Sequence, residues 1–233
     1  MASFVFVHGA WHGGWCWQSV IEELARNGHH SVAPDLPCDD VAAGWSEYLA
    51  VTLGAMDEIE GEVVVVGHSL AGGVIPLVAI RRPVRRLVFI GSFPPEPGKT
   101  LDEAIGTEQD LTDPRALVFR DARDPQGRYV WPNFEAARYA MYNDCSEESA
   151  RWAYAHLRPQ ATRPFSERWP SDIWPEVPIT FIVCADDRMG AAGPLRRVAK
   201  RRFGIDAVEL AGGHSPFLCH PDEVVRALIS TLS

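Results

Sequence analysis

Runs of apolar residues alternate with amphipathic stretches along this chain in a regular order. Short apolar runs typical of buried strands occur at residues 3–7, 30–33, 63–66, 86–90, 179–184 and 206–210. Stretches with apolar residues at helical spacing occur at residues 16–25, 45–59, 74–80, 194–203 and 222–232. Strands that alternate with helices form right-handed crossover units. The pattern therefore predicts an α/β protein with a mostly parallel sheet of about six strands and helices on both faces.

Residues 94–177 interrupt this alternation. The stretch is rich in proline, aspartate, arginine and aromatic residues, and clear helical patterns occur only at residues 134–142 and 146–157. An insertion that is too long for a plain loop and too irregular for a second domain commonly forms a lid or substrate-binding element. We therefore predict one domain, with a core made of residues 1–93 and 178–233 and an inserted cap at 94–177.

The length and the net charge of the chain argue against some classes of function. With 233 residues, 46% of them hydrophobic, the chain is long enough to bury one sizeable core. The formal net charge of −9 argues against a nucleic-acid partner, because phosphate binding needs a positive surface. No apolar run approaches the roughly 20 residues of a membrane span, and the first residues lack the features of a secretion signal. We therefore expect a soluble, cytoplasmic protein that does not act at a membrane.

The residue types that often bind metals do not form a recognisable cluster. The five cysteines are scattered and contain no C-x-x-C pair, so reduced, partly buried thiols are expected. His8 and His12 are four residues apart, but glycines around them indicate a loop, and no third ligand group accompanies them. Hydrogen bonding within that loop is the better interpretation. Neither a metal nor another cofactor is expected.

A nucleophile is suggested by the segment 67–73, Gly-His-Ser-Leu-Ala-Gly-Gly, which directly follows a strand of four valines. Glycines on both sides of Ser69 let the strand and the next helix approach closely. Ser69 would then lie on a sharp turn, with its hydroxyl at the carboxyl edge of the sheet. Such a turn is typical of a nucleophile elbow, although an ordinary helix-capping serine is the alternative.

Partners that a serine nucleophile needs follow later strands. Asp186 and Asp187 come after the strand at 179–184, and His214 comes after the last strand, so the chain order is serine, acid, histidine. The carboxyl ends of parallel strands meet at one edge of the sheet. We therefore expect Ser69, one of the two aspartates and His214 to lie together.

These residues would support ester hydrolysis through an acyl-enzyme. His214 would take the proton of Ser69 during attack on the ester carbonyl, and the aspartate would orient the imidazole ring. The backbone N–H groups of Leu70, directly after the nucleophile, and of Ala10, in the glycine-rich first loop, would bind the oxyanion.

Four segments of the chain resemble the α/β-hydrolase superfamily, within it the small single-domain branch of plant methyl esterases, hydroxynitrile lyases and bacterial relatives. They are residues 6–17 (FVHGAWHGGWCW), 67–70 (GHSL), 184–188 (CADDR) and 212–217 (GGHSPF). The resemblance spans nearly the whole chain and implies a three-layer α/β-hydrolase fold with an inserted cap. It also favours Asp187 over Asp186 as the acid.

The chain departs from the family pattern at three positions. The elbow of the family usually has glycine where this chain has Ala71, and hydroxynitrile lyases have a threonine and a lysine where this chain has Gly9 and Ser215. Without that lysine, which would handle a cyanide leaving group, the chain resembles the esterases.

The resulting prediction is a cofactor-free serine hydrolase acting on small, partly apolar or aromatic esters, which include methyl esters. Two alternatives stay open: lyase or amide chemistry with the same triad, and a ligand-binding protein with little turnover on a hydrolase scaffold. In the cap, Trp131, Tyr142 and Trp152 either line an apolar substrate pocket or fill the contact between cap and core.

Overall fold

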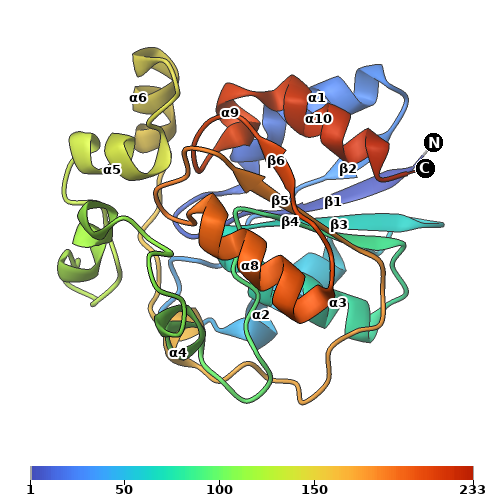
Figure 1. The fold of residues 1–233 in the computed structure, drawn as a ribbon, viewed down its shortest axis with the longest axis horizontal. Coiled ribbons are helices and arrows are strands. Elements are labelled where there is room, and N and C mark those ends of the chain that lie inside the picture. The colour runs from blue at the N-terminus through green and yellow to red at the C-terminus, as the bar shows by residue number, and fades with distance from the viewer. Residues whose placement is uncertain (1, 233) are drawn as a thin grey trace.

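The computed structural model describes residues 2–232 and contains one sheet of six parallel strands (Figure 1). Their order across the sheet is β2-β1-β3-β4-β5-β6. The predicted α/β-hydrolase fold with about six parallel strands is therefore confirmed. The strands are β1 (Ser3–Val7), β2 (His30–Val32), β3 (Val63–His68), β4 (Arg86–Ile90), β5 (Ile179–Cys184) and β6 (Val208–Leu210).

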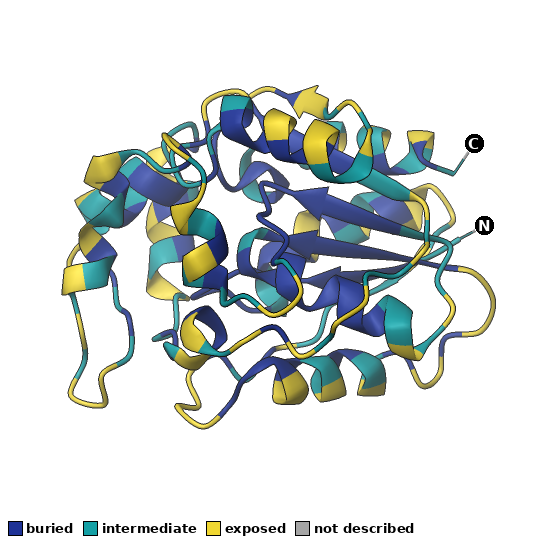
Figure 2. Cartoon of the chain, turned by 60° about the horizontal axis from the view of Figure 1, so that its bottom comes forward, coloured by how far each residue is buried: buried dark blue, intermediate teal, exposed yellow. Residues whose placement is uncertain are grey.

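Alternate residues of the central strands pack into two separate cores, one on each face of the sheet. Phe4 of β1 and Val64 of β3 face one core, whereas their neighbours Val5 and Val65 face the other. Because side chains alternate along a strand, continuous apolar runs are needed when both faces are covered. Figure 2 shows these strands buried between helices whose exposed sides face outward.

Helices cover both faces of the sheet and create its three layers. One face is covered by α1 (Gln18–Arg26) and α10 (Pro221–Ser230). The other is covered by α2 (Trp45–Gly54), α3 (Ile75–Arg81) and α8 (Ala192–Phe203). Short helical turns join these elements: η1 (Gly14–Trp17), η2 (Ser69–Gly73) and α9 (Pro216–Cys219).

The chain between β4 and β5 lies beyond the carboxyl ends of the strands, at the left and lower left of Figure 1. The two helices predicted there are present, while the other three elements lack an α-helical periodic signal long enough to predict them. The five elements are α4 (Leu101–Gly106), η3 (Pro114–Asp121), α5 (Phe134–Met141), α6 (Glu147–Ala155) and α7 (Arg163–Ser166).

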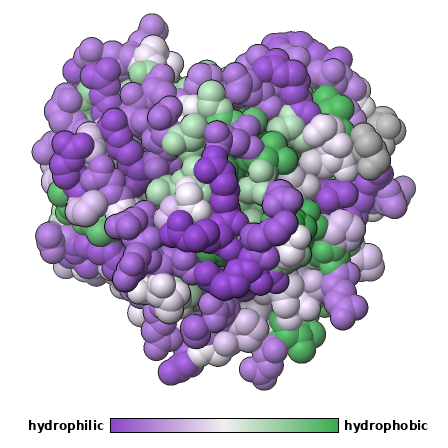
Figure 3. Space-filling view, viewed as in Figure 1, coloured by the Kyte–Doolittle hydropathy of each residue, from purple (hydrophilic) through white to green (hydrophobic). Residues whose placement is uncertain are grey.

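Polar side chains dominate the face of the molecule seen in Figure 3, and a smaller hydrophobic area lies near its middle. Within residues 2–232, every helix is too short or too polar to cross a lipid bilayer.

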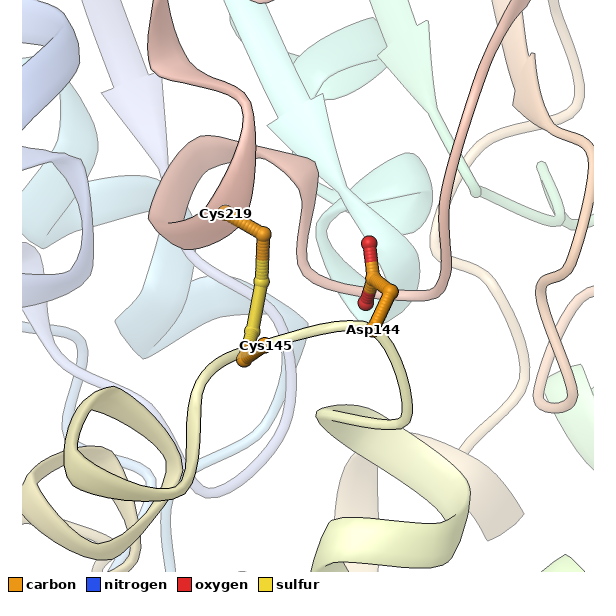
Figure 4. Close-up of side chains that lie close together, drawn as sticks. All are labelled: Asp144, Cys145 and Cys219. Carbon is orange, nitrogen blue, oxygen red and sulfur yellow. A yellow bond between two sulfur atoms is a disulfide. The ribbon is translucent and has the colours of Figure 1, made fainter.

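Two of the five cysteines form a disulfide, which corrects the expectation of reduced thiols throughout. Cys145, between α5 and α6, is bonded to Cys219 at the end of α9 (Figure 4). The pair is separated by 74 residues in sequence, so its proximity depends on the tertiary fold and leaves no trace in cysteine spacing. Cys16, Cys38 and Cys184 are buried free thiols, and burial raises the pKa of Cys38 to about 12.

Close packing at Gly73 supports a stability prediction. A Cβ atom at Gly73 would overlap the ring of Trp45, which is fully buried. Gly73→Ala is therefore expected to lower the free energy of unfolding by about 1–3 kcal/mol. Gly54→Ala is the matched control, because a Cβ at this position of α2 meets no atom within 4 Å and removes a flexible residue from a helix. Urea unfolding of both variants measures the effect, and equal stabilities would contradict it.

Candidate active site

Ser69 lies at the junction between β3 and η2, with a positive φ of 50°. This left-handed conformation is uncommon for a residue with a side chain and turns the chain sharply at the carboxyl end of the strand. A Cβ at Gly67 would lie 2.8 Å from Ile75 Cγ2, and one at Gly72 would lie 2.7 Å from Ser92 Oγ. The turn therefore requires these two glycines.

Ala71, where related elbows have glycine, fits the turn as it stands. It is 1% exposed and lies within η2, and the positive φ falls at Ser69 instead. The backbone carbonyl of Ala71 accepts a hydrogen bond from the N–H of Val74. The extra methyl group is thus part of the buried core beneath the turn.

His214 and Asp187 form a buried hydrogen-bonded pair. His214 Nδ1 lies 2.8 Å from Asp187 Oδ2 and 3.0 Å from Oδ1, and their side chains are 2% and 0% exposed. Asp187 Oδ1 also accepts hydrogen bonds of 2.8 Å from the N–H groups of Met189 and Gly190. With Oδ1 held by these two donors, the carboxylate is fixed in orientation and His214 carries its proton on Nδ1.

Asp186 points elsewhere. Its residue is exposed, and its backbone N–H donates to the carbonyl of Gly212 at 2.9 Å. The geometry therefore brings Asp187, and not Asp186, to the candidate base. Gly91, with φ of 51°, leaves room for this carboxylate, since a Cβ there would lie 3.0 Å from Asp187 Oδ2.

A pocket with about 610 Å³ of empty space, partly open to solvent, joins the carboxyl edge of the sheet to the inserted segment. Ser69 and His214 both line it, as do the candidate oxyanion donors Ala10 and Leu70. The opposite wall is apolar and comes from the inserted segment; it includes Leu101, Ile105, Leu111, Leu117, Phe119 and Phe165. One cation, Arg120, also lines the pocket and is ion-paired with Asp102 at 2.9 Å.

A second serine, Ser92, is hydrogen-bonded to the backbone of the turn that carries Ser69. The hydroxyl of Ser92, just after β4, donates a 2.6 Å hydrogen bond to the backbone carbonyl of Ser69. Sequence reasoning missed Ser92 because its role depends on a neighbouring strand. Its position at the carboxyl end of a strand was the available signal.

Three other histidines lie buried and neutral around the site. His8 Nδ1–H donates to the Gly9 carbonyl while Nε2 accepts from the Leu36 N–H, and burial lowers the pKa of His8 to about 4. His12 donates to the Ala10 carbonyl, and burial lowers its pKa to about 3. These bonds match the expected role of both residues within the first loop.

His68, which directly precedes the candidate nucleophile Ser69 in the chain, also contacts the candidate base His214. Its Nε2–H donates a 2.8 Å hydrogen bond to the backbone carbonyl of His214, and the two rings lie 4.5 Å apart. Burial holds the pKa of His68 well below its ordinary value. A neutral ring in this place supports the His214 loop without adding charge.

The three aromatic residues suggested for the pocket lie outside its lining, which corrects that expectation. Trp131 packs behind the wall, with its ring 5.5 Å from that of Phe119. Tyr142 is fully buried and its hydroxyl hydrogen-bonds His12 Nε2 at 3.0 Å. Trp152 is 46% exposed and packs against Trp15. The alternative interpretation, that these residues fill contacts between cap and core, agrees with the structure.

The apolar pocket wall was not recognised in the sequence. Leu101 and Ile105 are four residues apart on α4, whereas Leu117 and Phe119 lie on η3. Spacing on so short a helix gives a weak signal, and η3 has no α-helical period. Only folding of the inserted segment over the sheet brings these side chains together.

The structure contains one group of metal-ligand residue types within 4.8 Å of one another, among the residues it describes: Asp144, Cys145 and Cys219. The two sulfur atoms are joined in the disulfide, so neither is available as a thiolate ligand. We therefore interpret the group as a covalent contact between cap and core.

Comparisons with known proteins identify the family of this chain. The model of the alpha/beta hydrolase family matches residues 4–227. The pyrethroid hydrolase of Sphingobium wenxiniae is 25% identical over 243 residues, covering 98% of this chain and 86% of that protein. The carbendazim hydrolyzing esterase of a Nocardioides species is 37% identical over 113 residues, covering 43% and 46%.

A solved structure extends the similarity to three dimensions. The crystal structure of polyneuridine aldehyde esterase superimposes with a TM-score of 0.82, covering 100% of both chains at 21% sequence identity. The similarity in fold thus runs through the core and the inserted segment alike, and the family match spans nearly all of the sequence. The chain belongs to the alpha/beta hydrolase family.

Proposed function

We propose that this protein is a serine hydrolase that cleaves small carboxylic esters with an apolar or aromatic acyl group, methyl esters among them. The observation that supports the proposal is a pocket lined by both Ser69 and His214, with His214 hydrogen-bonded to the buried Asp187. Its esterase and hydrolase relatives support the same reaction class.

In the proposed mechanism, Ser69 Oγ moves within hydrogen-bond reach of His214 Nε2 and attacks the ester carbonyl carbon. His214 takes the serine proton, and Asp187 stabilises the imidazolium that forms. The backbone N–H groups of Leu70 and Ala10 donate to the oxyanion of the tetrahedral intermediate. Collapse of the intermediate transfers the proton from His214 to the departing alcohol and leaves Ser69 acylated. Water then attacks the acyl-enzyme through the same steps, releasing the acid.

The substrate class follows from the pocket wall. Residues 94–177 act as a cap whose leucines and phenylalanines contact the acyl group, and the one cation in the wall, Arg120, is already paired with Asp102. A charged acyl group would lose water without gaining a free counter-ion. Each added methylene contributes about 0.8 kcal/mol when buried, so kcat/KM should rise roughly fourfold per methylene until the pocket is full.

Covalent labelling tests this function directly. We expect a fluorophosphonate to add to Ser69, detected by mass spectrometry of the labelled peptide, and p-nitrophenyl butyrate to be hydrolysed faster than its acetate. The variant Ser69→Ala should lose both the label and the hydrolysis. Ser215→Ala is the matched control, because Ser215 is adjacent to His214 yet fully buried, and its hydroxyl has no hydrogen-bond partner.

Labelling at a residue other than Ser69, or full ester hydrolysis by Ser69→Ala, would exclude the proposed mechanism. The substrate panel also contains a cyanohydrin and an anilide. Faster turnover of either than of any ester would assign lyase or amidase chemistry instead.

A further inference from the structure

Four consecutive residues between α5 and α6 each bond to a loop at the carboxyl edge of the sheet. This 142–145 segment makes one contact per residue: Tyr142 Oη with His12 Nε2 at 3.0 Å, Asn143 Nδ2 with the Asp186 carbonyl at 3.2 Å, Asp144 Oδ2 with His220 Nε2 at 3.0 Å, and Cys145 with Cys219 through the disulfide. Each of the four side chains thus takes part in one of these contacts.

The loops contacted are those that carry the proposed catalytic groups. His12 lies in the loop with the oxyanion donor Ala10, and Asp186 directly precedes the acid Asp187. Cys219 and His220 lie at the end of the chain segment that begins with His214, spanning α9. The 142–145 segment therefore connects all three loops from the cap side.

The 142–145 segment packs tightly against the loop that carries His214. A Cβ atom at Gly213 would overlap Asn143 Oδ1, and one at Gly212 would overlap Asp144 Oδ2. Figure 4 shows Asp144 beside this loop, with the disulfide joining the 142–145 segment to α9. Movement of the segment would thus be transmitted directly to the backbone next to His214.

Stability alone does not explain the polar residues of this contact. The Oδ1 atoms of Asn143 and Asp144 are buried and have no hydrogen-bond donor among the protein atoms of the described residues. A buried polar atom without a partner costs free energy, so apolar residues of similar size would pack there at lower cost. A role in fixing the loops accounts for their presence.

We propose that the 142–145 segment positions the loops that carry Asp187 and His214 for catalysis, and that the Cys145–Cys219 disulfide makes this positioning depend on the redox state of the two cysteines. The proposal rests on the proposed function. None of the four residues lines the apolar pocket within the described chain. Loss of the disulfide should therefore lower kcat while leaving KM nearly unchanged.

The redox step needs a dithiol as co-reactant. One thiolate of the dithiol attacks the sulfur of one cysteine, which forms a mixed disulfide and releases the other cysteine as a thiolate. The second thiolate of the dithiol then displaces the first cysteine. The bond becomes two thiols, and the dithiol becomes a cyclic disulfide. The other three cysteines are already free thiols, which a dithiol leaves unchanged, so this pair is the group that responds.

The test compares the oxidised wild-type protein with the same protein reduced by dithiothreitol, using p-nitrophenyl butyrate. We expect reduction to lower kcat about tenfold, since small misplacement of catalytic groups has effects of this order or larger, while KM changes less than twofold. The double variant Cys145→Ser/Cys219→Ser should show the low kcat with and without dithiothreitol.

Asn143→Ala gives an independent readout with the disulfide intact. The variant loses the hydrogen bond to the Asp186 carbonyl, so kcat should fall while KM stays unchanged. Circular dichroism shows whether the reduced protein keeps its fold, and this variant tests the positioning role in either case. Unchanged kcat in both the reduced protein and Asn143→Ala would overturn the positioning role, as would an increase in KM alone. If the oxidised wild type does not hydrolyse esters through Ser69, the proposed function itself fails, and this inference fails with it.

Discussion

Asp187→Asn is expected to lower kcat for ester hydrolysis by about 10⁴-fold. Asp187 Oδ1 accepts two backbone hydrogen bonds, from Met189 and Gly190, so the amide oxygen of an asparagine would occupy that position. Its NH₂ group would then face His214 Nδ1. A neutral imidazole next to that donor holds its proton on Nε2, which leaves Ser69 without a base.

Asp186→Asn provides the matched control. Asp186 is exposed, and the carboxylate bonded to His214 is that of Asp187, so kcat should stay within a factor of about three, because a surface substitution of this kind has little effect on folding or geometry. Steady-state kinetics of the two variants on one ester measures the contrast. Similar losses in both would mean that Asp187 does not orient the base.

Lowering the pH from 7 to 5 is expected to reduce the free energy of unfolding by roughly 4 kcal/mol through His8 and His12, and further through His68. Burial lowers the pKa of His8 to about 4 and that of His12 to about 3, from the 6.5 of an ordinary histidine. At pH 5 the unfolded chain therefore binds a proton at each of these two residues that the folded chain does not, and burial of His68 acts in the same direction. This stability is present above pH 6.5 and is lost as the pH falls toward the folded pKa values.

Guanidinium unfolding at pH 7 and pH 5 measures this effect. In His12→Gln one of the two rings is absent, so the loss between the two pH values should shrink by roughly 2 kcal/mol. The wild-type protein, measured in the same two buffers, is the reference. An identical pH dependence in His12→Gln and the wild type would show that His12 is not the cause.

Much of the fold could be predicted because the sheet is buried on both faces. The strand predictions at residues 86–90 and 179–184 match β4 and β5, where every residue must be compatible with a covered sheet. The helix predicted to reach residue 59 ends at Gly54 instead. Met56 and Ile59 are still buried, so the apolar pattern continued past the end of the helix and was mistaken for more of it.

The candidate site was predictable to the extent that topology places it. Parallel strands bring their carboxyl ends together, and this put Ser69 and His214 at one edge from the sequence order alone. Chain order alone did not separate the two aspartates. The family resemblance favoured Asp187, and in the structure Asp186 is exposed whereas Asp187 is buried. The pocket wall and the disulfide depend on how the inserted segment packs, which no local pattern encodes.

The strand order also has a consequence for how the chain folds. Strands β1 to β4 lie within the first 90 residues and pair with one another, whereas β5 reaches β4 only after the inserted segment has been made. Forming contacts across so long a loop is slow in folding, and the N-terminal part of a nascent chain leaves the ribosome first. Ser69 belongs to this early half, but Asp187 and His214 belong to the late half. A half-synthesised or half-folded chain therefore carries the nucleophile without its base.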